Sequence, residues 1–373
     1  MRNTTTEAAP DRADLERHVA ELTTAVNHGA ISRRRWITGM LAAGVAGPSI
    51  LAAMGDAIAQ QAKDLRVFVV PKFTGFVFFE LARDGAEKAC EAQGCELTYV
   101  GTTTADVEGQ VQVYQNLVPQ RPDVIVTAAL DLNAGVPALE RARKQGTVVV
   151  TFDADVAPRG RDLFVNMAPF DVQARAMLES ALANVPEGGQ AIWVAPTPTV
   201  ANFISQKAAL DELIADDPRY ASIEFIDTLY AEDDAEKSYS VGTSAMQAHP
   251  DLKLFISGSG ISVPALNKAI EDTGRRGEVY ATGYGLPDTM TTYLANDTIK
   301  QYALWSPFDF GYLATWAGIL IKAGELEVEP GTTFDVPDLG TREIGEDQTV
   351  NLNAMLFFTK KHDTFETGVP MAM

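Results

Sequence analysis

The sequence predicts an α/β protein with two doubly wound lobes, each built on a parallel sheet covered by helices. Two observations predict this fold class. From Arg66 onward, short β-branched runs bounded by Gly, Pro or Asp alternate with stretches of helical periodicity, which is the pattern of repeated β-α-β units. The length of 373 residues also exceeds the size at which single hydrophobic cores stop growing, so two lobes are expected.

Two sets of alternating elements correspond to these lobes. In the first set we expect strands at 66–70, 96–100, 124–127 and 147–152, with helices at 78–93, 106–119 and 133–144. The second set begins after Asn166, with a helix at 170–184, strands at 190–195, 223–228, 252–257 and 279–282, and helices at 201–216, 234–247 and 263–273. Because a helical crossover joins parallel strands, each lobe is predicted to contain a parallel sheet.

The C-terminal part is less regular than the two lobes. It offers a strand at 300–304, a helix at 308–323, charged hairpin material at 325–353 and a last apolar strand at 354–358. A segment of this kind after two complete lobes is expected to return across a hinge. The expected N-terminal lobe is 60–168 plus about 306–330, the expected C-terminal lobe is 169–305 plus about 331–362, and 363–373 form a tail.

The N-terminal segment has the features of an export leader. Residues 32–37, SRRRWI, resemble the twin-arginine motif, with Trp36 in place of the usual phenylalanine. An uncharged, Gly- and Pro-containing run from Trp36 to Gly55 precedes the small residues Ala57-Ile58-Ala59. An uncharged run of this length could span a bilayer, but its composition and its small-residue exit favour cleavage. We therefore expect 1–59 to be a cleaved leader, the twin-arginine export machinery to be a partner, and the protein to be periplasmic.

The charge and the scarcity of metal ligands exclude several classes of function. The formal net charge is -20, and it falls entirely after Gln60, since residues 1–59 hold six acids and six arginines. A body this acidic is repelled by nucleic acid. The expected mature chain contains two histidines, His249 and His362, and two cysteines, Cys90 and Cys95, so neither a metal centre nor a cofactor is expected. The two cysteines form either a disulfide across a turn or two free thiols.

Polar and aromatic residues gather where the predicted strands end. They are Lys72, Asp131, Asp153, Asn202 and Phe203, followed by the segments Ser257-Gly258-Ser259-Gly260, Gly283-Tyr284-Gly285 and Trp305-Ser306-Pro307, while Phe76, Phe78 and Phe79 open the first helix. In open α/β sheets a ligand binds outside the carboxyl ends of the strands. Carboxylate, amide and lysine groups pair with hydroxyls, and aromatic rings pack against the apolar face of a sugar. The pattern therefore favours a carbohydrate ligand.

Several motifs carry a resemblance to a known family. PKFTGFVFFELARDGAEKA, PDVIVTAALD, TFDADVAPRGRDLFVN and YALWSPFDFGYLAT resemble periplasmic substrate-binding proteins of ATP-binding-cassette (ABC) sugar importers, most closely the rhamnose-binding and autoinducer-binding branch. The resemblance covers nearly all of Leu65 to Glu366. It implies the type I periplasmic binding protein fold, with a three-segment hinge and lobes that close on the ligand. It also implies a monomer that binds a deoxyhexose such as rhamnose, or a pentose, and serves a permease and its ATPase. An autoinducer or a polyol is the alternative ligand.

The same resemblance assigns roles to individual residues. Lys72 and Asp153 match ligand contacts of the autoinducer branch, whereas Asn202-Phe203 replaces its acid-glutamine pair, and Gly258 and Gly260 replace a proline and an alanine. Similarity to pentose-binding relatives implies that Phe78 and Phe79 stack on the sugar ring, Asp131 bonds its hydroxyls and Trp305 makes a contact near the hinge. The differences from the autoinducer branch favour a plain sugar over a signal molecule.

Each assignment has a structural alternative, and so does the function. Phe78, Phe79 or Trp305 could be ordinary core residues, and Asp153 could only cap a turn. An exported carbohydrate-active hydrolase is the alternative from another class, but no G-x-S-x-G elbow occurs and His249 lies beside Pro250. The glycine pairs around Ser259 and Tyr284 each lack the third glycine of a dinucleotide-binding fingerprint. We therefore expect a binding protein without catalytic residues.

Overall fold

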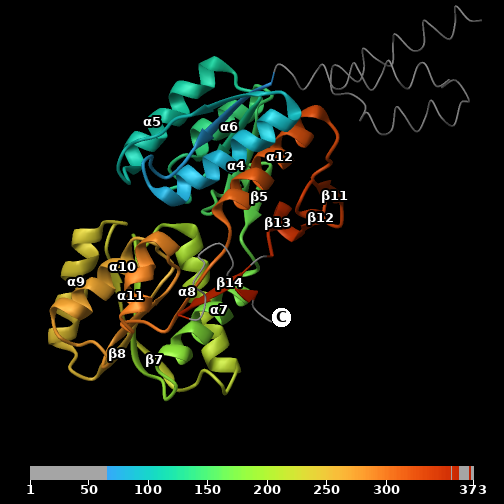
Figure 1. Ribbon diagram of the computed structural model, residues 1–373. Coiled ribbons are helices and arrows are strands. Elements are labelled where there is room, and N and C mark those ends of the chain that lie inside the picture. The colour runs from blue at the N-terminus through green and yellow to red at the C-terminus, as the bar shows by residue number, and fades with distance from the viewer. Residues whose placement is uncertain (1–64, 354, 361–368, 371–373) are drawn as a thin grey trace, which may run out of the picture.

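The computed structural model describes residues 65–353, 355–360 and 369–370. The predicted leader, with its twin-arginine motif, lies outside these residues, as does most of the predicted tail. The described chain forms two α/β lobes joined at a narrow waist (Figure 1). No helix among the described residues is long and apolar enough to cross a membrane.

The N-terminal lobe is built on an eight-stranded sheet of order β11-β12-β13-β5-β4-β3-β1-β2. Its parallel strands are β1 (Arg66–Val70), β2 (Glu96–Tyr99), β3 (Val124–Thr127), β4 (Val148–Phe152), β5 (Leu163–Asn166) and β13 (Thr349–Asn351). The hairpin β11 (Thr333–Val336) and β12 (Gly340–Gly345) adds antiparallel strands at one edge. The inner strands are buried on both faces, which explains their continuous apolar sequence.

Alternate strand residues pack against helices on opposite faces of this sheet. Val124 and Val150 share a core with α4 (Val77–Gln93) and α12 (Pro307–Ala323), whereas Ile125 and Val149 share one with α5 (Val107–Leu117) and α6 (Val136–Lys144). Helices α4 and α12 approach so closely that a Cβ on Gly311 would lie 1.9 Å from the carbonyl oxygen of Ala82. Only glycine permits this contact.

The C-terminal lobe has a four-stranded parallel sheet of order β7-β6-β8-β9. The strands are β6 (Gly189–Ala195), β7 (Ile223–Tyr230), β8 (Leu252–Ser257) and β9 (Tyr280–Gly283). One face packs on α7 (Phe170–Asn184) and α8 (Ala201–Asp216), the other on α9 (Ala235–Ala248) and α10 (Ser262–Asp272). Helix α11 (Pro287–Ala295) follows β9, and a small antiparallel sheet of β10 (Gln301–Leu304), β14 (Leu356–Thr359) and β15 (Val369–Pro370) completes the lobe.

Among the described elements, three connections pass between the lobes. They connect β5 to α7, β10 to α12 and β13 to β14. Two of them are bonded to each other, since the N–H of Leu352 donates to the carbonyl of Asn166 at 2.8 Å and that of Asn353 donates to the carbonyl of Met167 at 2.9 Å. The predicted fold class, with two parallel-sheet lobes, is confirmed.

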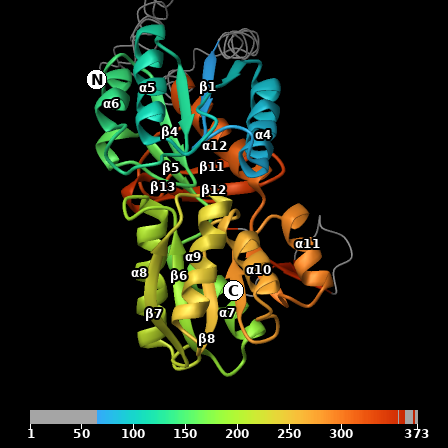
Figure 2. The same cartoon turned by 90° about the vertical axis from the view of Figure 1, so that its left-hand side faces the viewer.

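The expected division of the C-terminal segment was wrong in part. Residues 333–351 were assigned to the C-terminal lobe, but β11, β12 and β13 extend the sheet of the N-terminal lobe and lie at the junction of the lobes (Figure 2). Strand β13 has one buried apolar residue, Val350, which pairs with Val165 of β5. A strand this short has no periodicity from which its sheet could be predicted. The sequence also did not predict β5 or α11.

Cys90 and Cys95 form a disulfide across the turn between α4 and β2. Gly94 ends α4 in the left-handed conformation, with a φ of 76°, which glycine adopts without steric cost. The sequence left open whether the two thiols pair, and the structure shows the paired form.

Candidate ligand-binding site between the lobes

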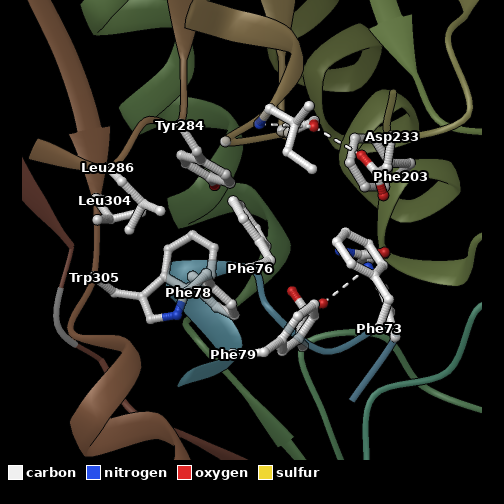
Figure 3. A pocket seen from close by; sticks show the side chains of 17 residues that line it. Phe73, Phe76, Phe78, Phe79, Phe203, Asp233, Tyr284, Leu286, Leu304 and Trp305 are labelled. Carbon is white, nitrogen blue, oxygen red and sulfur yellow. Dashed lines mark hydrogen bonds and ion pairs between the residues drawn. The ribbon is translucent and has the colours of Figure 1, made fainter. Parts of the chain in front are cut away.

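A cavity lies where the carboxyl ends of strands from both lobes face each other (Figure 3). Its volume of about 50 Å³ is that of a few water molecules, at roughly 10–15 Å³ each. The cavity is therefore compact. Its lining residues are Lys72, Phe73, Phe76, Phe78, Phe79, Asp153, Asn202, Phe203, Asp233, Gly258, Ser259, Gly260, Ile261, Tyr284, Leu286, Leu304 and Trp305.

An ion pair between Lys72 and Asp153 forms the charged part of the cavity. Lys72 follows β1 and Asp153 follows β4, and these strands flank β3, so both residues reach the same edge of the sheet. The Lys72 ammonium lies 2.8 Å from the Asp153 carboxylate, and the side chains are only 5% and 9% exposed. Asp153 has a φ of 61°. A non-glycine residue in this conformation is strained, and such strain is concentrated at binding and active sites.

Phenylalanine and tryptophan rings form the apolar wall. Phe76, Phe78 and Phe79 contact one another with ring centroids 5.2–6.3 Å apart. Trp305 follows β10, at the start of a segment between the lobes, and packs edge-to-face on Phe78 with the ring centroids 5.6 Å apart. Phe203, from the opposite lobe, places its ring 5.7 Å from the Lys72 ammonium. Phe78, Phe79 and Trp305 are buried and also line the cavity, so they belong to the core and to the cavity wall.

Three buried polar atoms that belong to lining residues have no hydrogen-bond partner among the described residues. They are Asn202 Oδ1, the Tyr284 hydroxyl and Trp305 Nε1, and the three side chains are 4% exposed or less. Burial raises the pKa of Tyr284 well above its ordinary value, so the hydroxyl keeps its proton. A buried polar group without a partner costs about 1–3 kcal/mol. Water or a polar ligand in the cavity would complete the bonding of these groups.

Asp233 is a lining residue that the sequence analysis missed. It lies in the loop between β7 and α9 and accepts a hydrogen bond of 2.7 Å from the Ser259 hydroxyl. Burial raises the pKa of Asp233 above its ordinary value, although Lys72 and Ser259 act in the opposite direction. The predicted strand ended at 228, and β7 ends at Tyr230. The sequence could have indicated this residue, because Asp233 and Asp234 follow a predicted strand closely, as Asp153 does.

The comparisons with known proteins agree with this geometry. Residues 67–326 match the family model of the periplasmic binding protein domain. The chain belongs to this family. Because it is a family of binding proteins, the expectation that the chain is not an enzyme is confirmed. Among the described residues, no group of three or more His, Cys, Asp or Glu side chains is placed to hold a metal ion.

Three solved structures show how similar this periplasmic binding protein is to others. A sugar ABC transporter protein from Actinomyces odontolyticus is 31% identical, with a TM-score of 0.66, and the match covers 82% of this chain and 99% of that one. LsrB from Clostridium saccharobutylicum in complex with AI-2 is 26% identical, with a TM-score of 0.74 and coverages of 80% and 98%. An ABC transporter solute-binding protein from Clostridium phytofermentas with bound L-rhamnose is 25% identical, with a TM-score of 0.76 and coverages of 80% and 97%.

Eight of the nine residues predicted to bind the ligand line the cavity of this binding protein, and Asp131 does not. Asp131 accepts hydrogen bonds of 2.8 Å from the backbone N–H groups of Asn133 and Ala134. Burial acts to raise its pKa, but these bonds and one with the Thr199 side chain outweigh it, so the pKa is lowered. Thr199 belongs to the C-terminal lobe, and its carbonyl also accepts from the N–H of Leu132 at 3.3 Å. Asp131 therefore contacts the opposite lobe through Thr199 and is not part of the cavity wall.

Gly258 is required by a buried chain of amides behind the cavity. A Cβ at Gly258 would lie 2.3 Å from Gln206 Oε1. Gln206 Nε2 donates to Gln173 Oε1 at 3.0 Å, and Gln173 Nε2 donates in turn to Asn166 Oδ1 at 3.0 Å. Asn166 begins the first crossing segment. The chain of amides thus connects the back of the cavity to the hinge.

Proposed function

We propose that this protein is the solute-binding component of an ABC sugar importer and that it binds one monosaccharide between its two lobes. The observation that carries the proposal is a set of buried polar groups on Asn202, Tyr284 and Trp305 that find no partner within residues 65–353, 355–360 and 369–370. They surround the same cavity as the Lys72–Asp153 ion pair. A sugar presents adjacent hydroxyls that both donate and accept hydrogen bonds, so it satisfies such a mixed set. The rhamnose-bound and sugar-transporter structures similar to this chain support the same class of ligand.

A deoxyhexose such as rhamnose, or a pentose, is the ligand class that we propose. The aromatic wall and the buried side chains of Leu286 and Leu304 offer an apolar surface for a ring face or a deoxy carbon, where a hydroxyl would find no partner. The small cavity volume also favours a single ring. An autoinducer is the second candidate, because the similar LsrB structure contains AI-2.

We propose that the lobes close on the ligand and that a permease and its ATPase recognise this closed form. Both lobes supply lining residues, and Lys72 meets Phe203 across the cavity. A ligand that contacts both lobes favours the closed arrangement, because those contacts are complete only when the lobes meet. We further propose that the protein reaches the periplasm through the twin-arginine route and acts there as a monomer.

A ligand screen tests the proposed function. The purified protein would be melted with L-rhamnose, D-ribose, D-arabinose, polyols and AI-2, and each hit would be titrated by calorimetry. A ligand present at 100 times its Kd stabilises the native state by about 2.7 kcal/mol, which shifts the melting temperature measurably. The proposal is contradicted when no sugar shifts the melting temperature while a chromogenic ester or glycoside is turned over, a result that would favour an exported hydrolase.

A further inference from the structure

The cavity contains one carboxylate more than its cations can pair. Lys72 contributes one positive charge, and Asp153 and Asp233 contribute two negative charges. The Lys72 ammonium lies 2.8 Å from Asp153, whereas no ion pair of Asp233 is present among the described residues. Figure 3 shows Asp233 beside Phe203 on the far side of the pocket from Trp305 and Phe78. Within the part of the chain that the structure describes, Asp233 is therefore a carboxyl group without an ion-pair partner of its own.

The loop backbone separates Asp233 from its neighbour Asp234. Glu232 and Asp233 both have positive φ values, 53° and 48°, which turn the chain sharply between β7 and α9. After this turn Asp234 caps α9 by accepting from the N–H of Lys237 at 2.8 Å, and Asp233 lines the cavity. Strain at two successive non-glycine residues indicates that the position of Asp233 is specified by more than loop closure.

Ser259 fixes the way in which Asp233 can bond. The Ser259 oxygen accepts from the N–H groups of Ile261 at 3.2 Å and Ser262 at 3.1 Å, at the start of α10. Its single proton is donated to Asp233 Oδ1 at 2.7 Å. Because a hydroxyl has one proton only, Asp233 Oδ1 has to accept. Oδ2 has no hydrogen-bond partner among the described residues and is left for a donor from a ligand.

We propose that Asp233 is a ligand-binding residue of the C-terminal lobe; this inference rests on the proposed function. Together with Asp153, Asp233 admits neutral and amino sugars and excludes acidic sugars. Hydroxyl and ammonium groups donate to a carboxylate, and bonds of this kind are stronger than those between neutral groups. A uronate or a sugar phosphate would place a further negative charge against two carboxylates that share one lysine. Like charges brought together in a desolvated site cost several kcal/mol.

The substitution Asp233→Asn tests this role, because it removes the charge while the amide oxygen can still accept from Ser259. Its matched control is Asp234→Asn, the same change one residue later on the capping side chain. Calorimetry would use L-rhamnose and D-ribose as neutral probes, D-galactosamine as the basic probe, and D-ribose 5-phosphate and D-galacturonate as acidic probes. We expect the wild type to bind at least one neutral probe and neither acidic probe. Asp233→Asn should bind that neutral probe about 10- to 100-fold more weakly, and Asp234→Asn should bind it like the wild type.

The outcomes separate this inference from the proposed function. If the wild type binds a neutral probe and Asp233→Asn binds it with the same Kd, the role of Asp233 is contradicted and the sugar-binding function stands. Tight binding of an acidic probe by the wild type would contradict the charge selection in the same way. If the wild type binds no sugar at all, both proposals fail. Circular dichroism and the melting temperature of Asp233→Asn check that the variant is folded.

Discussion

The Lys72 ammonium and the Asp153 carboxylate lie 2.8 Å apart in a cavity where both side chains are more than nine-tenths buried. In such a place a charge is stable only when it is paired and further hydrogen-bonded. Here the pair also shares its cavity with the aromatic wall and with the polar groups of Asn202, Tyr284 and Trp305, which have no partner in the described chain. The pair therefore has a structural role in the unliganded protein and a binding role in the complex, and experiments can separate the two.

Removing one member of this pair should damage stability and binding together. Lys72→Met leaves Asp153 buried without its counter-ion, so we expect a loss of about 3–5 kcal/mol in the free energy of unfolding and no measurable sugar binding. The double variant Lys72→Met/Asp153→Asn removes both charges and should regain much of the stability but none of the binding. Urea denaturation and calorimetric titration measure the two effects. Sugar affinity unchanged in Lys72→Met would remove the ion pair from the site.

The two glycines of the second lobe's cavity should differ sharply in their tolerance of a side chain. Gly258→Ala places a methyl group 2.3 Å from Gln206 Oε1, and the same amide group is held by its bond to Gln173. We expect a loss of about 1–3 kcal/mol, as for other overpacked cores. Gly260→Ala is the control, because its nearest atom is Phe76 Cζ at an ordinary 3.5 Å. The free energy of unfolding of Gly260→Ala should stay within about 0.5 kcal/mol of the wild-type value. If thermal unfolding shows the same loss of stability for both variants, the amide chain does not constrain Gly258.

The amide chain toward the hinge should be sensitive to its middle member. Gln173→Leu removes the partner of Gln206 Nε2 and one donor to Asn166 Oδ1. A buried polar group left without a partner costs about 1–3 kcal/mol, so the variant should lose at least about 2 kcal/mol in denaturant unfolding. Gln112→Leu changes an exposed glutamine of α5 in the same way and should be nearly neutral. A neutral effect of Gln173→Leu would mean that water or a rearrangement replaces these bonds.

The disulfide between Cys90 and Cys95 should contribute modestly to stability, because it closes a short loop. With a sequence separation of 5, the chain-entropy model gives about 2 kcal/mol. Cys90→Ala/Cys95→Ala should therefore melt lower than the oxidised wild type. Reduction of the wild type with dithiothreitol should lower its melting temperature by a similar amount and leave the double variant unchanged. A wild type insensitive to reductant would show that the bond contributes nothing.

Asp233 should make the unliganded protein less stable as the pH rises. Its pKa in the folded state is raised by burial above the ordinary value of 3.8, so the native state holds the proton more tightly than the unfolded state does. The stability that this proton provides is complete below pH 3.8 and is lost as the pH passes the raised pKa. Asp233→Asn lacks this loss, so it should exceed the wild type in stability at pH 7 and approach it near pH 4. A stability difference between Asp233→Asn and the wild type that grows toward low pH would contradict a raised pKa of Asp233. The groups that set this pKa are Lys72, Ser259 and Asp153.

Much of the architecture was predictable because the inner strands are continuous apolar runs and the helices are long. The bounds predicted for α7, α8 and β8 match the structure. The strands that were missed or misassigned are β5 and β11 to β13, and the last three lie within the charged hairpin material at 325–353. Strand β13 pairs with β5, which lies far away in the sequence, and no local pattern encodes such a pairing.

Part of the site was predictable from one rule, namely that the carboxyl ends of parallel strands meet at the same edge of a sheet. The rule placed Lys72, Asp153 and Asn202 correctly beside the cavity, because each follows a strand of a parallel sheet. It failed for Asp131, which also follows a strand but turns back to bond its own loop. It missed Asp233, because the end of β7 was placed two residues early. The turn that directs Asp131 away from the cavity could not be predicted without the backbone conformation of its loop.

The most direct test of the central claim is a calorimetric titration of the purified wild-type protein with L-rhamnose and the other monosaccharides of the screen, repeated with Lys72→Met/Asp153→Asn. We predict that one sugar binds the wild type at one molecule per chain and that the same sugar gives no binding heat with the folded double variant. Binding of that sugar with equal affinity to both proteins, or no binding of any sugar to the wild type, would contradict a monosaccharide site between the lobes.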